Sequence, residues 1–564
     1  MARKIVVIGG VATGPKAAAR ARRLDPEAQI TIVEQGEIVS YAGCGMPFFV
    51  GGLIEDVSEL RRTMAGALRD EGYFRATKDI TVRTQTRADA IDRQRKEVTV
   101  LNLKTGDQEK LPYDKLVIST GSVPVVPNIE GRELNRVFCL ANPKDAVAIR
   151  KAALARDVSR VAVIGAGAIG MEVVDAVAGL GVPVVLFELL PQVMPTFLDP
   201  EVAALLEKYV VSEGAEVHTS ERVLRLEGDE QQNVRKVITD KGEVAVDLVV
   251  LAVGVRPNVQ LARDAGLEIG PTGAIAVNEY LQTSDPHIYA GGDCVEVTNL
   301  VSGRKIYAPL GSTANKHGRV IGDNLVGRRE TFAGVTGTTV LKVFEYNIGR
   351  TGLSEKQARD LGYEVITATA SAPDTAHYYP EHHTILIKLV VDAKDGRVLG
   401  AQALGPGETV KRIDVVVTAL TFGATVDQLA KLDLGYAPPF NTAIDILAHA
   451  ANLIRNKRDG LAVAIAPDLV HEKLDQNDDF VLLDVRTPDE YGARHVDHSN
   501  VMLVPLGKLR ERMAELPKDR PIVTVCQLGL RSYEAQTILA GAGFKDVKFM
   551  EGGFHAWPFE LVTE

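Results

Sequence analysis

The chain has 564 residues, of which 46% are hydrophobic and 24% are charged, and its formal net charge is −10 at pH 7. This length is too great for a single hydrophobic core, and the negative charge argues against a nucleic-acid or anionic-membrane partner. The four cysteines lack metal-ligand spacing, and no apolar run is long enough to span a membrane. We therefore expect a soluble, multi-domain cytoplasmic protein without a metal site.

A glycine-rich turn at residues 9–14 follows the first predicted strand, 4–8. The turn leads into an alanine- and arginine-rich helix pattern, and a second apolar run at 30–33 ends at Glu34. Strand, glycine turn, helix, strand and acid form a dinucleotide-binding unit, in which backbone N–H groups hold a pyrophosphate and the carboxylate takes the ribose hydroxyls. Val11 stands where the usual pattern has its second glycine, so this motif alone leaves a purely structural turn open.

A single cysteine, Cys44, lies among small residues in the stretch 40–47. A thiol does redox or nucleophilic work as the thiolate, and neighbouring glycines let backbone N–H groups or a flat cofactor approach the sulfur. Taken alone, this stretch is more often typical of an inert, buried cysteine. The case for chemistry depends on the motifs around it.

A second glycine-rich turn, at residues 165–170, follows a strand at 160–164 and carries the complete dinucleotide fingerprint. Its second strand ends at Glu188, and this acid favours NADH over NADPH because a carboxylate would repel a 2′-phosphate. Glu172 lies just inside the following helix. The sequence is equally consistent with a surface position and with a position near the nicotinamide.

Two further predicted strands end in similar glycine- and proline-containing turns, at 120–124 and 254–258. The repeat of fingerprint and turn indicates two related nucleotide domains, one nested in the other. A later strand at 288–290 ends in Gly291-Gly292-Asp293, which places an acid beside two glycines.

With these motifs, residues 1 to about 450 resemble the pyridine nucleotide–disulfide oxidoreductases, which use FAD and NAD(P)H. Asp293 is in a stretch similar to the family's second flavin motif. The Cys44 stretch resembles the single-cysteine branch, which contains NADH oxidases and peroxidases, coenzyme A-disulfide reductases and NADH-dependent persulfide reductases. No second cysteine lies nearby, so Cys44 would cycle through a mixed disulfide, a persulfide or a sulfenic acid.

The motifs and the resemblance together assign residues to cofactors. The expected FAD residues are Gly9, Ala12, Gly14, Glu34, Ser40, Thr120, Gly121 and Asp293. The expected NADH residues are Gly165, Gly167, Ile169, Gly170, Glu172, Glu188 and Gly254. For the phosphates of coenzyme A, the candidates are Arg20, Arg22 and Arg23, and a solvated helix face is an equal alternative.

From about residue 332 the chain carries no nucleotide motif, which fits the family's dimerisation domain and predicts a homodimer. Segments 376–380 and 434–440 are similar to those of coenzyme A-disulfide reductases, in which two tyrosines of the partner subunit reach the active-site sulfur. By that resemblance, Tyr436 and one of Tyr378 or Tyr379 stabilise a CoA thiolate. Packing at a dimer interface is the alternative.

A second candidate cysteine, Cys526, lies between a strand at 521–525 and a helix pattern, in a loop with Arg531. Backbone N–H groups and a positive charge would lower the pKa of the thiol and hold a terminal sulfur anion. With residues 483–486 and 552–557, this loop resembles the rhodanese family, in which the loop cysteine carries a persulfide. A non-catalytic rhodanese fold remains open.

The expected fold class is α/β, with two nested Rossmann-like domains, an α+β dimerisation domain and a C-terminal α/β rhodanese domain. The expected boundaries are residues 1–112 and 286–325 for the FAD domain, 113–285 for the NADH domain with connecting segments, 326–450 for the dimerisation domain, 451–464 for a charged linker and 465–564 for the rhodanese domain.

The expected function is FAD-dependent reduction of CoA disulfide or CoA persulfide (polysulfide) by NADH, with CoA as substrate or bound ligand. Cys44 is the redox cysteine in this interpretation, and Cys526 passes sulfane sulfur to or from CoA. One alternative is an NADH oxidase or peroxidase that forms a sulfenic acid on Cys44. Another treats the rhodanese unit as a docking or sensing module without sulfur transfer.

Overall fold

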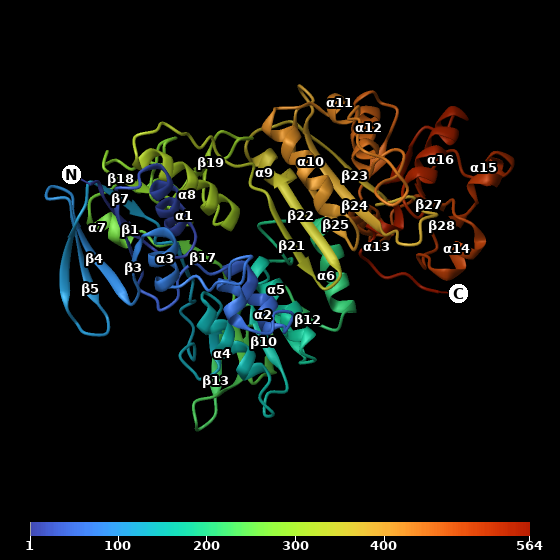
Figure 1. Cartoon of the computed structure of the whole chain (residues 1–564). Coiled ribbons are helices and arrows are strands. Elements are labelled where there is room, and N and C mark those ends of the chain that lie inside the picture. The colour runs from blue at the N-terminus through green and yellow to red at the C-terminus, as the bar shows by residue number, and fades with distance from the viewer. Residues whose placement is uncertain (1, 564) are drawn as a thin grey trace. The chain divides into compact units, whose positions relative to one another are not determined.

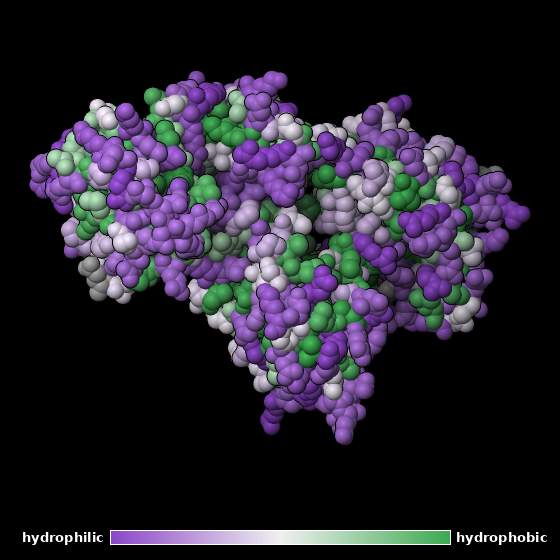
Figure 2. All heavy atoms as spheres, turned by 180° about the vertical axis from the view of Figure 1, so that it is seen from behind, coloured by the Kyte–Doolittle hydropathy of each residue, from purple (hydrophilic) through white to green (hydrophobic). Residues whose placement is uncertain are grey.

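The computed structural model describes residues 2–563, which form two compact units (Figure 1). The first unit contains the residues up to Leu190 and Gly214–Val335, and the second contains Pro191–Glu213 and the chain from Thr336 onward. The chain therefore crosses between the units three times, at 190–191, 213–214 and 335–336. Within the described part, no helix is long and apolar enough to cross a bilayer. The face in Figure 2 is mostly hydrophilic, with hydrophobic residues in separate patches.

The first unit contains a five-stranded parallel sheet in the order β18-β7-β1-β2-β3. Its strands are β1 (Lys4–Ile8), β2 (Gln29–Val33), β3 (Thr81–Arg83), β7 (Lys115–Ile118) and β18 (Ile288–Ala290). Helices α1 (Thr13–Leu24) and α8 (Gly311–Leu325) pack together closely. Gly318 and Gly322 permit this approach, since a Cβ at either position would collide with α1. Strand β7 and the core residues at 259–275 belong to this sheet domain, although the expected boundaries place them with the second domain.

A second five-stranded parallel sheet, in the order β12-β11-β10-β16-β9, follows the second fingerprint. Its strands are β9 (Val137–Cys139), β10 (Val161–Ile164), β11 (Val184–Phe187), β12 (Glu216–His218) and β16 (Leu248–Leu251). Strands β10, β11 and β16 are buried throughout and consist of apolar runs, as expected for parallel strands covered on both faces. The predicted α/β class with two Rossmann-like sheets is confirmed.

Smaller elements complete the first unit. Its antiparallel strands are β4 (Thr86–Asp92), β5 (Glu97–Asn102), β6 (Gln108–Pro112), β8 (Ser122–Pro124), β13 (Val223–Gly228), β14 (Val234–Thr239), β15 (Glu243–Ala245), β17 (Val255–Pro257), β19 (Val297–Thr298) and β20 (Lys305–Ile306). Its other α-helices are α2 (Met46–Val50), α3 (Glu71–Lys78), α4 (Pro143–Ala153), α5 (Ala168–Gly179) and α7 (Gln260–Asp264).

The second unit begins with a five-stranded antiparallel sheet in the order β21-β22-β25-β24-β23. Its strands are β21 (Thr339–Val343), β22 (Tyr346–Gly352), β23 (Val365–Pro373), β24 (Thr384–Asp392) and β25 (Val398–Gly405). The helices of this part are α6 (Pro200–Ser212), α9 (Glu355–Asp360), α10 (Thr409–Thr421), α11 (Val426–Leu429) and α12 (Ile446–Arg458). Helix α6 belongs to this unit although its sequence lies within the expected NADH domain.

A buried lysine holds α6 to the antiparallel sheet. The ammonium of Lys388 lies 3.0 Å from Asp199 and 2.7 Å from Glu355, and it also contacts the Glu201 carboxylate. Burial lowers the pKa of Lys388, but the carboxylates of Glu201, Asp199 and Glu355 raise it by more. The lysine is 1% exposed and stays charged, so its cation balances the acidic cluster at the start of α6.

Replacing Lys388 with methionine is expected to lower the free energy of unfolding of this unit by about 3 to 5 kcal/mol, because buried carboxylates lose their cation. Chemical denaturation monitored by circular dichroism measures the change. The control is Lys356→Met, which removes an exposed helix-surface pair with Asp360 and is expected to cost less than about 0.5 kcal/mol. Equal effects of the two substitutions would contradict this prediction.

The C-terminal domain of the second unit is a parallel sheet in the order β26-β30-β29-β27-β28. Its strands are β26 (Ala464–Ile465), β27 (Val481–Asp484), β28 (Val501–Leu503), β29 (Ile522–Val525) and β30 (Val547–Met550). The helices are α13 (Pro467–Asp475), α14 (Pro488–Ala493), α15 (Leu506–Arg512) and α16 (Leu530–Gly541).

The segment expected to be a charged linker, 451–464, contains the second half of α12, which packs on β23. Charged side chains alternate here with buried apolar side chains at helical spacing. The apolar face of α12 therefore packs on the sheet, and the charged side chains are left to form ion pairs. The ammonium of Lys457 binds the Glu551 carboxylate and the Thr367 carbonyl, the latter at 2.8 Å. The Thr369 N–H also donates to Glu551, at 2.8 Å, so the C-terminal domain is fixed on β23.

Candidate active site

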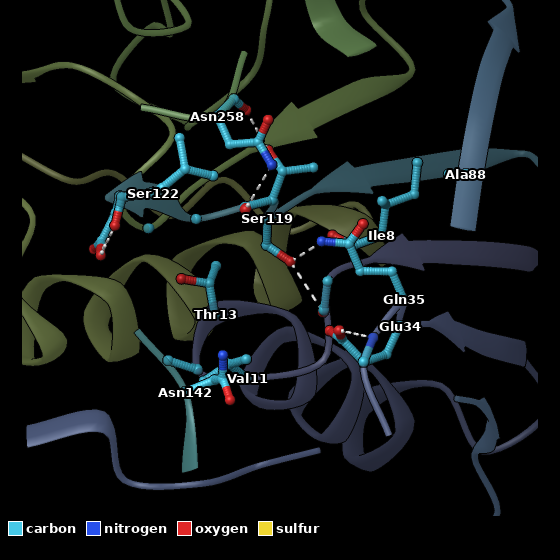
Figure 3. A pocket seen from close by; sticks show the side chains of 18 of the residues that line it. Ile8, Val11, Thr13, Glu34, Gln35, Ala88, Ser119, Ser122, Asn142 and Asn258 are labelled. Atoms are coloured by element: carbon cyan, nitrogen blue, oxygen red, sulfur yellow. Dashed lines mark hydrogen bonds between the residues drawn. The ribbon is translucent and has the colours of Figure 1, made fainter. Parts of the chain in front are cut away.

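A cavity of about 840 Å³ opens at the carboxyl ends of β1, β2, β7 and β18 (Figure 3). Figure 3 shows Glu34 and Ser122, from different elements, on different sides of it. Ligands of open α/β sheets bind at this edge. Six of the predicted FAD residues line the cavity, namely Gly9, Ala12, Glu34, Thr120, Gly121 and Asp293. Gly14 and Ser40 lie outside its lining and shape the backbone behind it.

The first glycine turn is held by close backbone contacts. Gly9 has a φ of +103°, and a Cβ there would collide with the Ser119 carbonyl. The Glu34 carboxylate accepts the N–H of Gly10 and that of Gly36, each at 2.7 Å. Val11 is not among the residues with a positive φ, so its side chain is accommodated where the usual motif has glycine.

Cys44 lies in a 3₁₀ turn, Gly43–Gly45, directly before α2, and it is exposed. Helix α8 begins beside it, because a Cβ at Gly311 would lie 3.7 Å from Cys44 Sγ. Although the residue as a whole is exposed, partial desolvation of its thiol raises the pKa of Cys44, and the charges of Glu172 and Asp293 raise it further. The structure therefore brings the lone cysteine, the second fingerprint helix and the flavin-motif acid within electrostatic range of one another.

Glu172 lies on α5 and is half-buried. Burial and the nearby Asp175 carboxylate raise its pKa to about 7. A carboxyl group with that pKa exchanges its proton near neutral pH, which is a property of groups that take part in acid–base steps. Glu172 is therefore not a fully exposed surface residue, and its position near the nicotinamide stays a prediction.

The second glycine turn repeats the construction of the first. Gly165 has a φ of +104°, and a Cβ on Gly170 would collide with the Gly165 carbonyl. The Glu188 carboxylate accepts the N–H of Ala166 at 2.7 Å and that of Leu190 at 2.9 Å. Open space lies beside Gly167 and Gly254, and Ile169 is 36% exposed, so this side of the turn is accessible to a ligand.

His317, on α8, is a site residue that the sequence analysis missed. It is fully buried, and its Nδ1 accepts the N–H of Gly292 at 3.1 Å, directly before Asp293. Its Nε2 has no hydrogen-bond partner among the described residues, and burial lowers its pKa to about 4. The neutral ring thus holds the turn that carries Asp293. A histidine 25 positions after the motif gives no sequence signal of that contact.

The low pKa of His317 predicts an acid-sensitive contribution to stability. The unfolded chain takes up this proton near pH 6.5 and the folded chain near pH 4, so stability is intact above pH 6.5 and falls as the pH drops towards 4. His317→Gln is expected to remove up to about 3 kcal/mol of that pH dependence, measured by denaturant unfolding at pH 7, 5.5 and 4. The exposed His377→Gln is the control, and an unchanged pH slope in the His317 variant would contradict the assignment.

Two of the three candidate CoA arginines are already engaged within the fold. Arg20 donates two hydrogen bonds to Asp323, at 2.9 and 2.8 Å. Arg22 donates to the carbonyls of Pro26 and Asp79. Arg23 is exposed. A CoA phosphate would therefore have to compete with Asp323 for Arg20, whereas Arg23 is accessible.

The candidate tyrosines lie in the second unit, in two neighbouring loops. The hydroxyls of Tyr378 and Tyr436 are 3.4 Å apart, and the two side chains are 64% and 51% exposed. Tyr379 is half-buried. Tyr378, rather than Tyr379, is therefore the tyrosine that pairs with Tyr436.

Cys526 is buried at the start of α16, where its Sγ accepts the N–H of Gly529 at 3.2 Å and that of Ser532 at 3.3 Å. The predicted backbone cradle is therefore present. Arg531 donates two hydrogen bonds to Glu490, at 2.7 and 2.6 Å, and they hold the pKa of Glu490 at about 2. The positive charge that the sequence predicts in this loop is thus present, and it is paired with the Glu490 carboxylate.

Family models match three consecutive parts of the chain. The model of the pyridine nucleotide-disulphide oxidoreductase family matches residues 3–313, that of its dimerisation domain matches 338–448, and that of a rhodanese-like domain matches 466–559.

Three similar proteins cover most or all of the chain. The solved structure of a NAD-dependent persulfide reductase from A. fulgidus is 45% identical with a TM-score of 0.94, covering 98% of this chain and 100% of that one. An NAD(P)H coenzyme A polysulfide/persulfide reductase of Pyrococcus horikoshii is 37% identical over 455 residues, which are 81% of this chain and 99% of that protein. An NADH oxidase of Methanocaldococcus jannaschii is 34% identical over 448 residues, which are 79% of this chain and 98% of that protein.

Proposed function

This chain belongs to the pyridine nucleotide-disulphide oxidoreductase family, and from that membership we propose that it reduces the persulfide or the disulfide of coenzyme A with NADH. The observation that carries the proposal is the position of Cys44, directly before α2, which packs on the fingerprint helix α5, and beside the start of α8. The rhodanese-like domain adds a second cysteine site suited to sulfane sulfur.

The residues around the large cavity fit FAD, the flavin of this family. The cavity of about 840 Å³ has the glycine turn at one end, where Gly9 leaves room for close backbone contact, and Glu34 keeps free lone pairs for ribose hydroxyls. Gly9, Glu34 and Asp293 would hold the cofactor. When bound there, FAD would supply the two-electron chemistry that links NADH to the sulfur of Cys44.

In the proposed reaction, the Cys44 thiolate attacks the outer sulfur of CoA persulfide. A sulfur–sulfur bond forms on Cys44 while the sulfur–sulfur bond in CoA persulfide breaks, and CoA leaves as its thiolate. Two electrons and two protons then convert the Cys44 persulfide to thiol and hydrogen sulfide. The net reaction of NADH, a proton and CoA persulfide gives NAD⁺, CoA and hydrogen sulfide. Glu172, with its pKa of about 7, exchanges protons beside this sulfur.

The rhodanese-like domain supplies the substrate in this proposal. A persulfide on Cys526, held by the N–H groups of Gly529 and Ser532, transfers its outer sulfur to the CoA thiolate and leaves Cys526 as a thiolate. Tyr378 and Tyr436 donate to the CoA thiolate. They lie in the unit that does not contain Cys44, and we assign their contact to the partner subunit of a homodimer, in line with the dimerisation-domain match. We place the protein in the cytoplasm, because its reductant is NADH and its four cysteines are free thiols.

The decisive experiment compares NADH consumption under strict anaerobiosis, with CoA persulfide or CoA disulfide, with consumption in air without either. Fast anaerobic turnover with release of sulfide or CoA supports the reductase. The similarity to an NADH oxidase makes oxygen reduction the second candidate. Turnover in air alone would favour that reaction, in which Cys44 cycles as a sulfenic acid.

A further inference from the structure

Two loops carry the tyrosine pair, and each is closed at its base by one of its own side chains. The first tyrosine loop, residues 374–383, joins β23 to β24, and Asp374 Oδ1 accepts the N–H of His383 at 2.8 Å. The second tyrosine loop, residues 435–441, precedes α12, and Asn441 Nδ2 donates to the Gly435 carbonyl at 3.3 Å. Both loops therefore have a fixed base and an exposed tip.

One buried guanidinium joins the bases of the two loops. Arg412, on α10, is 1% exposed, and its Nη2 donates to the Asp374 carbonyl at 2.7 Å and to Asn441 Oδ1 at 2.9 Å. Its Nε donates to Asp445 at 3.0 Å, and its Nη1 donates to the Glu408 carbonyl at 2.9 Å. Each nitrogen of the side chain is thus used, and the planar fork fixes the two loops in one relative orientation.

The contacts between the loops beyond this base are few. The Ala376 N–H donates to the Pro438 carbonyl at 3.2 Å, and the two tyrosine hydroxyls meet at 3.4 Å. The tyrosine side chains are more than half exposed, so solvent and rotamer entropy oppose a fixed hydroxyl pair at the loop tips. The spacing of the hydroxyls therefore depends on the rigidity of the bases.

We infer that Arg412 is a positioning residue, which sets the distance between the Tyr378 and Tyr436 hydroxyls that receive the CoA thiolate. The inference rests on the proposed function, because only that function makes the two tyrosine hydroxyls donors to a CoA thiolate. A displacement of about 1 Å at a reacting group can cost as much as about 100-fold in rate. Loosening either loop base moves a hydroxyl by a distance of that order, although Arg412 itself touches neither tyrosine.

The test uses the full-length flavin-loaded enzyme and two loosening variants. Arg412→Lys keeps the charge but loses the fork, and Asn441→Ala releases the second tyrosine loop while leaving the arginine's other acceptors in place. The kcat for CoA persulfide is expected to fall about 10- to 100-fold in each, with KM for NADH and NADH-dependent ferricyanide reduction unchanged. Arg455→Lys, which alters an α12 surface pair with Asp427, is the control and is expected to retain the wild-type kcat.

A double-mutant cycle that combines the loosening variants with tyrosine variants separates an effect on tyrosine positioning from a general loss of stability. The Tyr378→Phe, Tyr436→Phe double variant is expected to keep a small but measurable kcat, and adding Arg412→Lys or Asn441→Ala to it should lower that kcat no further, because the pair to be positioned is gone. Wild-type kcat in both loosening variants, or fully additive losses, would overturn the inference while leaving the tyrosine role intact. An unaffected double tyrosine variant would overturn the inference together with the tyrosine part of the proposed function.

Discussion

Replacing Cys44 with serine is expected to lower kcat/KM for NADH-dependent reduction of CoA persulfide by about 1,000-fold or more. A serine hydroxyl stays protonated and forms no sulfur–sulfur bond, so the step that frees the CoA thiolate is lost. Anaerobic NADH oxidation, followed together with sulfide release, measures the effect. The flavin should stay bound, because the cavity that fits it is lined by other residues.

Cys139→Ser is the matched control, since it removes the half-buried thiol on β9 in the second sheet. It is expected to leave turnover unchanged. Persulfide reduction at the wild-type rate in the Cys44 variant would refute the assignment of Cys44 as the redox cysteine.

Replacing Cys526 with serine is expected to abolish the transfer of sulfane sulfur to CoA, again by about 1,000-fold or more, because the persulfide carrier is removed. Reduction of preformed CoA disulfide should continue at the wild-type rate, since of the two candidate cysteines that reaction needs only Cys44. The two reactions are measured in parallel, by CoA persulfide formation without NADH and by NADH oxidation with CoA disulfide.

This experiment also decides between sulfur transfer and a docking or sensing role for the rhodanese-like domain. Unchanged sulfur transfer in the Cys526 variant would favour the docking or sensing role. Loss of disulfide reduction as well would mean that the two cysteine sites are not separable.

Much of the nucleotide-binding architecture follows from local sequence. The glycine turns, the acids Glu34 and Glu188 and the strands beside them are adjacent in the chain, and backbone sterics dictate their arrangement. The departure at Val11 leaves the turn intact because that position does not need a positive φ. The backbone cradle of Cys526 was predictable for the same reason, since a loop at a helix start presents its own N–H groups.

The interactions that sequence analysis missed join residues far apart in the chain. Three of the four partners of Arg412, namely Asp374, Asn441 and Asp445, lie 29 to 38 positions away along the chain, and nothing local distinguishes this arginine from a surface residue. The pairing of Arg531 with Glu490, 41 positions apart, likewise needs the folded C-terminal sheet. The sequence predicts a linker at 451–464, because Asp427 and Glu551, which bind the charges of Arg455 and Lys457, are distant in sequence.

The threefold crossing of the chain between the units has a consequence for synthesis on the ribosome. Helix α6 leaves the ribosome early, but Lys388, which balances its acidic cluster, follows 187 residues after Glu201. At about 5 to 20 residues per second, the helix waits roughly 10 to 40 seconds for its partner, with its apolar face available to chaperones. The three crossings also affect proteolysis. A single cut at one crossing would leave parts of the two units joined covalently through the other two crossings.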